Sequence, residues 1–424
     1  MPSSKIGRLA RQFARRAFAA LASLSLVMAP IPAAHAEETG GVIRDAEIEA
    51  TLRAYADPIF TAAGLKPEEV RVYIVEDRSL NAFVSGGQNM FIHTGLIMAA
   101  QTPNQLKGVM AHETGHMAAG HLVRAREGQS QAMVPALISI GLGVLAMAGG
   151  APDAGAALIS GSQQFMIGQY MTFTQTQESS ADQAGVTYMD ATHQSPEGLL
   201  DFFQNFREQE LFSRDRREPL FRSHPLSSER IQALRERVEK SAYRDAKDSD
   251  ADMLRFKMMQ AKLYGYLEGA GRVYARYPDS DKSQPARYAR AFAAYRIPDM
   301  QRAAAETKEL IGLDGKNPYY QELMGQILFE SGHWADALPY DRKAVALSPD
   351  SVLLQTNLGR ALAASSKKED LDEAVKVLTR ATALEPDNPY AWSEMATAYG
   401  ALKQDGLAQL ASAEKNFALG NYPM

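Results

Sequence analysis

The chain of 424 residues contains no cysteine. Disulfides are therefore excluded, and so is a lipid anchor on an N-terminal cysteine. If the chain is exported, its stability must come from a packed core and from any metal that it binds. The composition is otherwise that of a soluble globular protein, with 46% hydrophobic and 22% charged residues. A chain of this length predicts two or three domains.

The chain also lacks a surplus of positive charge, because it has 45 basic and 50 acidic residues. Five of the basic residues lie in residues 1–36, before an uncharged apolar run at 17–29 and the small-x-small sequence Ala34-His35-Ala36. This pattern predicts a signal peptide, residues 1–36, cleaved after Ala36. The alternative is an uncleaved anchor, but the run is shorter than the ~20 residues of a membrane span. The remaining chain has a net charge of −10, which argues against nucleic acid as a partner.

Residues 37–241 show a mixed pattern. A helix is expected at 45–63, a strand at 70–75, and a hairpin whose second strand covers Asn89 to His93, followed by mainly helical sequence. A run of mixed charge at 240–252 predicts a junction between domains, placed at 242–256. The alternative interpretation of that run is a charged helix surface.

Residues 257–424 repeat themselves. Ala291, Gly325 and Gly359 are each 34 residues apart, and Ala303 and Ala337 follow the first two at the same offset. The period and the small residues resemble the tetratricopeptide repeat, in which paired helices approach closely. We therefore predict an α-solenoid over residues 257–424, whose concave surface would bind peptides or proteins.

The sequence HETGH marks a candidate metal site. Thr102 and the proline after it predict the start of a helix that should continue to about Arg124. His112 and His116 are four residues apart, so both imidazoles lie on one face of that helix and can hold a single tetrahedral metal ion. Glu113 lies beside them, where it can take a proton from water.

A catalytic zinc site needs a third protein ligand. The metzincin pattern is absent, because Ala119 and Leu122 occupy the places of its glycine and third histidine. His121 falls one residue too early for that role and is expected to support the site. The better candidate is Glu178, 62 residues after His116, with Asp182 one helical turn further on, where it can accept a hydrogen bond from a ligand histidine.

These motifs resemble the gluzincin metallopeptidases of the HtpX and CAAX prenyl endopeptidase family. The resemblance covers Asn81-Ala82-Phe83, HETGH with His121, the segment Glu178 to Asp182, and Ser223-His224-Pro225 with Arg230. It implies one Zn²⁺ held by His112, His116 and Glu178, Glu113 as the general base, and a strand that pairs with an extended substrate. We expect this strand at Asn89, Met90, Phe91, Ile92 and His93.

The same resemblance gives His224 two alternative roles. It either donates a hydrogen bond to the transition state or occupies the open position of the zinc and blocks the enzyme. Arg230 would bind a carboxylate near the site or stabilise local packing.

A signal peptide and tetratricopeptide repeats match a periplasmic branch of the family. The expected fold is mainly α with a small β-sheet, a zincin-type metalloprotease domain followed by an α-solenoid of tetratricopeptide repeats. The expected role is degradation of misfolded or stalled outer-membrane β-barrel proteins and help in their assembly, with the repeats binding the β-barrel assembly machinery. The alternatives are a non-proteolytic periplasmic chaperone and a membrane-integrated CAAX-type endopeptidase.

One further segment, residues 132–159, is almost free of charge. Its first 18 residues, 132–149, carry no charge and border on the length of a membrane span, but their glycine and proline residues disfavour a helix that faces lipid. We expect helices that shape or cover the cleft and make peripheral contact with a membrane or membrane protein. The alternative, implied by the HtpX-like members of the family, is a transmembrane segment.

Overall fold

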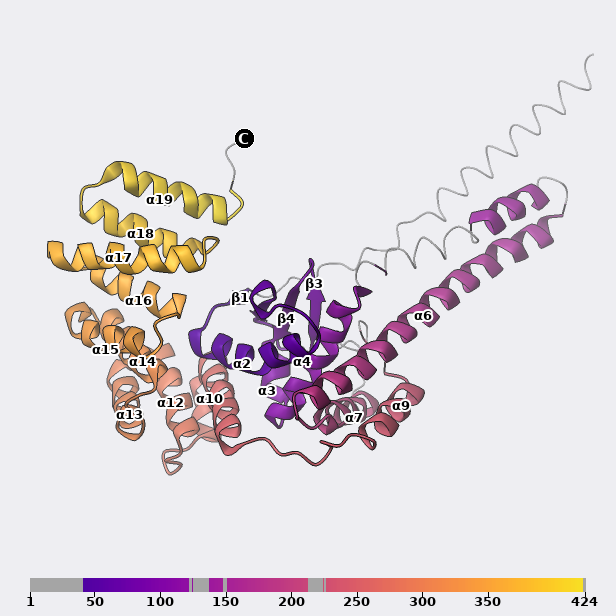
Figure 1. The fold of residues 1–424 in the computed structure, drawn as a ribbon, viewed down its shortest axis with the longest axis horizontal. Helices are drawn as coiled ribbons and strands as arrows, with labels where there is room; N and C mark the ends of the chain where they lie inside the picture. Colours follow the sequence, from indigo (N-terminus) through magenta and orange to yellow (C-terminus); the bar gives the residue numbers. More distant parts are fainter. Residues whose placement is uncertain are drawn as a thin grey trace, which may run out of the picture.

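The computed structural model describes residues 41–121, 124, 137–147, 151–212, 224 and 226–421. Figure 1 shows a mixed α/β unit, here called the N-terminal unit (residues 41–238), beside a stack of paired helices that curves away from it. The predicted fold class is confirmed, namely a mainly helical chain with one small sheet and a repeat domain after it. The predicted signal peptide lies outside the described residues.

The sheet of the N-terminal unit has four strands in the order β1-β2-β4-β3. They are β1 (Val42–Ile43), β2 (Arg71–Val75), β3 (Ala82–Ser85) and β4 (Asn89–His93). β2 and β4 are parallel, whereas β1 and β3 run antiparallel to their neighbours at the two edges. The hairpin of β3 and β4 turns at Gly86 and Gly87, which both have positive φ, a conformation that glycine adopts without steric cost.

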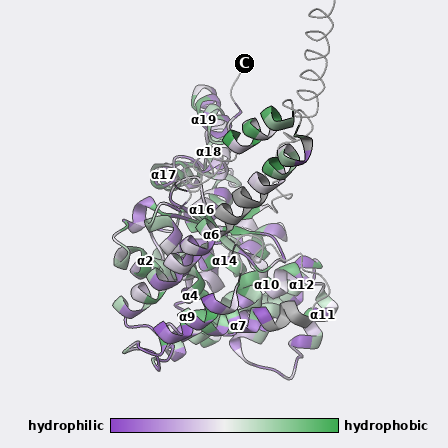
Figure 2. Cartoon of the chain, turned by 90° about the vertical axis from the view of Figure 1, so that its right-hand side faces the viewer, coloured by the Kyte–Doolittle hydropathy of each residue, from purple (hydrophilic) through white to green (hydrophobic). Residues whose placement is uncertain are grey.

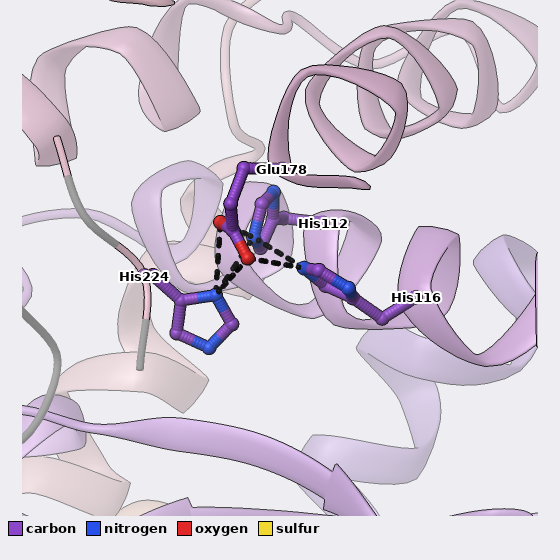
Figure 3. A group of neighbouring side chains, drawn as sticks. All are labelled: His112, His116, Glu178 and His224. Carbon is purple, nitrogen blue, oxygen red and sulfur yellow. Dashed lines mark hydrogen bonds and ion pairs between the residues drawn. The ribbon is translucent and has the colours of Figure 1, made fainter. Parts of the chain in front are cut away.

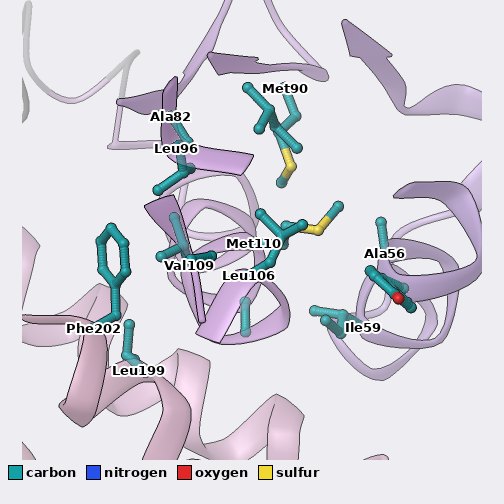
Figure 4. Close-up of a cluster of buried hydrophobic side chains, with 14 of the residues drawn as sticks. Ala56, Ile59, Ala82, Met90, Leu96, Leu106, Val109, Met110, Leu199 and Phe202 are labelled. Carbon is teal, nitrogen blue, oxygen red and sulfur yellow. The ribbon is translucent and has the colours of Figure 1, made fainter. Parts of the chain in front are cut away.

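Helices cover one face of this sheet and enclose the main core. They are α2 (Ala46–Ala62), α3 (Thr94–Ala99), α4 (Pro103–Ala118), α6 (Pro152–Ala191), α7 (Glu197–Phe212) and α9 (Ser228–Val238), with a short 3₁₀ turn at Pro67–Glu69. Figure 4 shows Met90 of the sheet facing Leu106 and Met110 of α4, with Leu199 and Phe202 of α7 on the far side of α4. α4 is therefore a central helix, buried by elements on several sides.

The helix α6 is 40 residues long, and its first half extends away from the N-terminal unit (Figure 1). A short helix at 137–147 lies against it, and the pair forms a hairpin through close backbone approach of Gly143 and Gly155. Figure 2 shows hydrophobic residues on this hairpin, where Leu145 is 69% exposed. Within the described ranges the hairpin points away from the body, so the expectation that residues 132–159 cover the cleft is wrong for them. None of the helices described is long and apolar enough to cross a membrane.

The repeat array consists of four helical pairs, and this confirms the tetratricopeptide prediction. The pairs are α12 (Gln284–Arg296) with α13 (Met300–Leu313), α14 (Pro318–Glu330) with α15 (Trp334–Leu347), α16 (Val352–Ala363) with α17 (Lys368–Leu384), and α18 (Pro389–Ala401) with α19 (Asp405–Ala418). The first helix of each pair starts at an N-cap whose side chain accepts a backbone hydrogen bond, at Ser283, Asn317, Ser351 and Asn388. The period in the sequence therefore reflects the spacing between the starts of these first helices.

The junction between the two parts is not a free linker. The charged run continues into α10 (Asp250–Leu267), followed by α11 (Ala270–Arg276). One face of α10 places Phe256, Met259 and Leu263 in the core of the N-terminal unit, while Met258 joins the core of the repeat array. The junction expected at 242–256 is therefore wrong in its second half, because residues 250–256 already form a helix shared by both cores.

Candidate metal centre

The helix α4 positions the HETGH residues. The Thr102 hydroxyl accepts a hydrogen bond from the backbone N–H of Gln105 (3.2 Å), so the helix begins where the sequence predicts. It ends at Ala118 rather than near Arg124, because Gly120 takes a positive φ of 64°. His112, Glu113 and His116 lie in its last two turns and are all buried.

Two glycines let α6 approach α4 at this point. A β-carbon on Gly115, the glycine of HETGH, would lie 2.9 Å from the backbone oxygen of Ala181. A β-carbon on Gly185 would lie 3.2 Å from the backbone nitrogen of His112. This close helix packing carries Glu178 and Asp182 to the two histidines, although they are about 65 positions away in the chain.

Four side chains bring ligand atoms together (Figure 3), and all four are buried. The His112 Nε2 lies 3.1 Å from the His116 Nε2, and Glu178 oxygens lie 3.4 Å and 3.3 Å from these two atoms. The His224 Nδ1 lies 3.0 Å from Glu178 Oε2 and 3.4 Å from His112 Nε2.

These separations fit a metal ion. A tetrahedral ion with bonds of about 2.0–2.1 Å keeps its ligand atoms about 3.3 Å apart. A metal ion between the two imidazole nitrogens at 3.1 Å would accept both lone pairs, whereas without a metal one ring has to donate to the other. Two histidines, one carboxylate and one more histidine form a donor set typical of zinc.

A second layer of groups holds the first. The Asp182 carboxylate lies 2.9 Å from His112 Nδ1 and favours a proton on that nitrogen, which leaves Nε2 as the atom that would bind a metal. Burial opposes this charge on Asp182, but Arg230 and His112 hold its pKa below the usual range. Although burial alone lowers the pKa of His112, Asp182 and Glu178 raise it to about 9. His121, predicted to support the site, lies with its Nδ1 3.0 Å from that of His116.

Arg230 connects the two carboxylates. Its Nη1 lies 2.8 Å from Glu178 Oε2, and its Nε and Nη2 contact the two oxygens of Asp182 at 2.5 Å and 2.9 Å. The guanidinium also lies over the ring of Phe203, 4.9 Å from its centroid. Of the two expectations for Arg230, carboxylate binding is the one that this geometry fits.

Glu113 is 1% exposed and lies beside the cluster. One of its oxygens is 3.4 Å from His224 Nε2, and the other has no hydrogen-bond partner among the described residues. A buried carboxylate oxygen without a partner is unfavourable unless a water molecule or substrate binds there. The two residues flanking His224 lie outside the described part of the chain.

The strand assigned to substrate binding is wrong. β4, with Asn89, Met90, Phe91, Ile92 and His93, pairs with β2 on one side and β3 on the other, so it has no free edge for another strand. The outer strand beside α4 is β3, from Ala82 to Ser85. The backbone N–H of His93 donates to Asn81 O (3.0 Å), and since antiparallel pairs alternate, the N–H and C=O groups of Ala82 and Val84 point to the free edge.

A cavity of about 600 Å³, which the sequence did not predict, lies next to the cluster. It is lined by Thr174, Gln175, Glu178, Ser179, Ser227, Glu229, Arg230 and Ala233. Thr174, Gln175 and Glu178 lie at helical spacing on one face of α6, so the position of the expected ligand on its helix could have indicated its two neighbours.

Comparison with known proteins defines the class. Residues 43–238 match the family profile described as Peptidase family M48. The N-terminal unit is thus a metallopeptidase domain, and the protein is a metalloprotease.

Two known metalloproteases and one repeat protein are similar to parts of the chain. The chain is 26% identical over 354 residues to the Beta-barrel assembly-enhancing protease of Escherichia coli (strain K12), covering 82% of this chain and 70% of that protein. It is 29% identical over 178 residues to the Metalloprotease LoiP of the same organism, covering 41% of this chain and 64% of LoiP. Among solved structures, YrrB, "a TPR protein with an unusual peptide-binding site", matches with a TM-score of 0.34 and 19% identity, covering 39% of this chain and 87% of that one.

Proposed function

We propose that this protein is a periplasmic zinc endopeptidase that degrades misfolded or stalled outer-membrane β-barrel proteins and assists their assembly. The main support is the cluster of four ligand atoms with the buried Glu113 beside it. The similarity to a β-barrel assembly-enhancing protease over 82% of the chain supports the substrate class. The predicted signal peptide supports the location.

In this proposal His112, His116 and Glu178 hold one zinc ion. When bound, the ion polarises the scissile carbonyl and makes a water molecule more acidic. Glu113 takes the proton of the attacking water and returns it to the leaving amine. Asp182 fixes the proton of His112 on Nδ1, and Arg230 keeps Asp182 and Glu178 in place.

The substrate would bind as an added strand along β3. Its backbone would meet the outward N–H and C=O groups of Ala82 and Val84, which puts it between the sheet edge and the cluster. On the outer face of the sheet the rings of Phe83, Phe91 and Tyr73 form a continuous stack, with centroids 4.9 Å and 5.0 Å apart. Side chains of a bound strand on that face could extend the stack, which favours substrates rich in aromatic and β-branched residues.

His224 would hold the enzyme in a latent state. Its Nδ1 occupies the fourth corner of the ligand cluster, the position that a catalytic zinc leaves open for water. Turning His224 away would free that position and leave its imidazole near Glu113, where it could donate to the transition state. The two alternative roles from the sequence are then two positions of one side chain.

The test uses an unfolded outer-membrane β-barrel protein incubated with the mature chain and three variants. We expect slow cleavage by the wild type, faster cleavage by His224→Ala, none by Glu113→Gln, and wild-type behaviour for His333→Ala, an exposed histidine of the repeat array. Metal analysis should find one zinc ion per chain in all four proteins.

If neither the wild type nor His224→Ala cleaves in a Glu113-dependent manner, the protease assignment fails for this substrate, and a chaperone acting through its repeats becomes the better hypothesis. The membrane-integrated alternative is checked separately, since it requires the protein to remain with membranes after an alkaline carbonate wash.

A further inference from the structure

A groove of about 450 Å³ lies between the repeat array and the N-terminal unit. One wall comes from the start of α2 and from α10, and the other from the first helices of the pairs, α12, α14, α16 and α18. Aromatic side chains from three of these elements, Tyr266, Tyr295 and Tyr390, line it. The groove therefore offers flat apolar surfaces to the side chains of a bound polypeptide.

A small recess shares four lining residues with this groove, namely Glu322, Gln326, Asn357 and Arg360. Its volume is about 10 Å³, which is the space of one water-sized group. Asp341 of α15 also lines it and is only 5% exposed. Among the described residues, the Asp341 carboxylate makes no hydrogen bond and no ion pair within 4.0 Å.

This carboxylate departs from the pattern of the repeats. Asp341 follows Gly325 by 16 residues, as Thr307 follows Ala291, and with the three-residue insertion Leu378 follows Gly359 at the same place. The Thr307 hydroxyl donates to a carbonyl of its own helix (2.8 Å), and Leu378 packs against Gly359. Only in the second pair does this position hold a charge without a partner.

Gly325 is what makes room for that charge. A β-carbon on Gly325 would lie 2.0 Å from Asp341 Oδ1, so any larger residue would push the carboxylate out. A buried carboxylate with no partner destabilises a fold, whereas leucine is accommodated at the matching position of the next pair. The repeat thus carries an unfavourable group that packing does not require.

The other groups around Asp341 define what it would bind. Glu322 accepts a hydrogen bond from Asn357 Nδ2 (3.0 Å), and Arg360 is held over the ring of Phe329 at 4.2 Å, with Glu330 3.7 Å away. Glu322 and Arg360 are therefore held by other groups, and the Asp341 carboxylate is the acceptor in the recess that lacks a partner among the described residues. One compact cation complements it, and a planar guanidinium exceeds the space.

We infer that the recess receives the ammonium group of a lysine from an extended polypeptide in the groove. The lysine stem would lie along the aromatic wall, with Asp341 and Glu322 accepting from its head. This inference rests on the expectation that the concave surface of the repeats binds polypeptide, and it does not depend on hydrolysis. It gives the groove a preference for lysine over arginine.

The experiment uses the mature chain carrying Glu113→Gln, so that cleavage cannot affect binding. The probe is fluorescent, reduced and alkylated α-lactalbumin in three forms, with its lysines unmodified, acetylated or converted to homoarginine. We expect the unmodified form to bind about tenfold more tightly than either modified form, which is the range for a hydrogen bond to a charged group. Asp341→Leu and Asp341→Asn should weaken binding of the unmodified form about tenfold and remove the difference between the three forms.

Asp336→Asn, an exposed acid on the same helix, should bind like the parent protein, and circular dichroism checks that the variants are folded. If acetylation weakens binding to Asp341→Leu as much as to the parent, the effect is general electrostatics, the recess holds only water, and the inference is wrong. It is also wrong if the parent binds none of the three forms. Neither result bears on Glu113-dependent cleavage, which is measured separately.

Discussion

Replacing Arg230 with methionine should destabilise the N-terminal unit strongly. The guanidinium is 6% exposed and is the cation that faces both Asp182 and Glu178. Methionine retains much of the apolar stem but leaves two buried carboxylates without it. Removing one partner of a buried ion pair costs about 3–5 kcal/mol. For a unit of about 200 residues this corresponds to a fall in Tm of roughly 6–20 °C.

The assay is thermal unfolding of metal-free protein, followed by far-ultraviolet circular dichroism. The two tryptophans, Trp334 and Trp392, both lie in the repeat array, so their fluorescence reports that part separately. We expect the circular dichroism transition to move far more than the fluorescence transition. The matched control is Arg235→Met, an exposed arginine on the same helix. A fall below 2 °C, or one equal to that of the control, would refute the view that Arg230 neutralises the site.

Three further outcomes follow from the contacts described. Asp182→Asn should lower zinc affinity about 10–100-fold in competition with a chelator, because His112 loses the negatively charged acceptor that fixes its tautomer; unchanged affinity would contradict this. Burial raises the pKa of Asp341 to about 7 from a usual 3.8, so the folded chain binds a proton that the unfolded chain releases, and stability falls as pH rises from about 4 to 7. At pH 8 the free energy of unfolding of Asp341→Leu, measured by urea denaturation, should therefore exceed that of the wild type by up to about 4 kcal/mol. Near pH 4 the two values should converge. In a cleaved peptide, N-methylation of successive amides should abolish cleavage at every second position, as pairing with β3 requires, and a pattern without period two would exclude strand addition.

Local features were predictable from the sequence because they depend on neighbouring residues. The start of α4 at Thr102 and the shared face of His112 and His116 follow from capping and helical spacing. Glu178 could be proposed as the third ligand from its residue type and from Asp182 one turn further on, but no local rule predicts contact between residues 62 positions apart. The structure shows that two glycines make this approach sterically feasible.

The order of the strands in the sheet could not be predicted from rules about neighbouring residues. β3 and β4 form a hairpin that the sequence predicts, but which of them is outermost depends on β2, which inserts on the far side of β4. The substrate strand was therefore assigned to the wrong partner of the hairpin. Asp341 was missed for a similar reason, because a carboxylate on an amphipathic helix looks solvated until the neighbouring helix places Gly325 against it.

The long helix α6 has a mechanical consequence. Glu178 lies 26 residues after the first residue of α6, a distance of about 39 Å along one continuous helix. The exposed apolar hairpin and the Glu178 carboxylate therefore belong to one continuous helix, which packs against Gly115 through Ala181, one turn after Glu178. A partner that binds the hairpin would therefore act on the position of the Glu178 carboxylate through an uninterrupted helix.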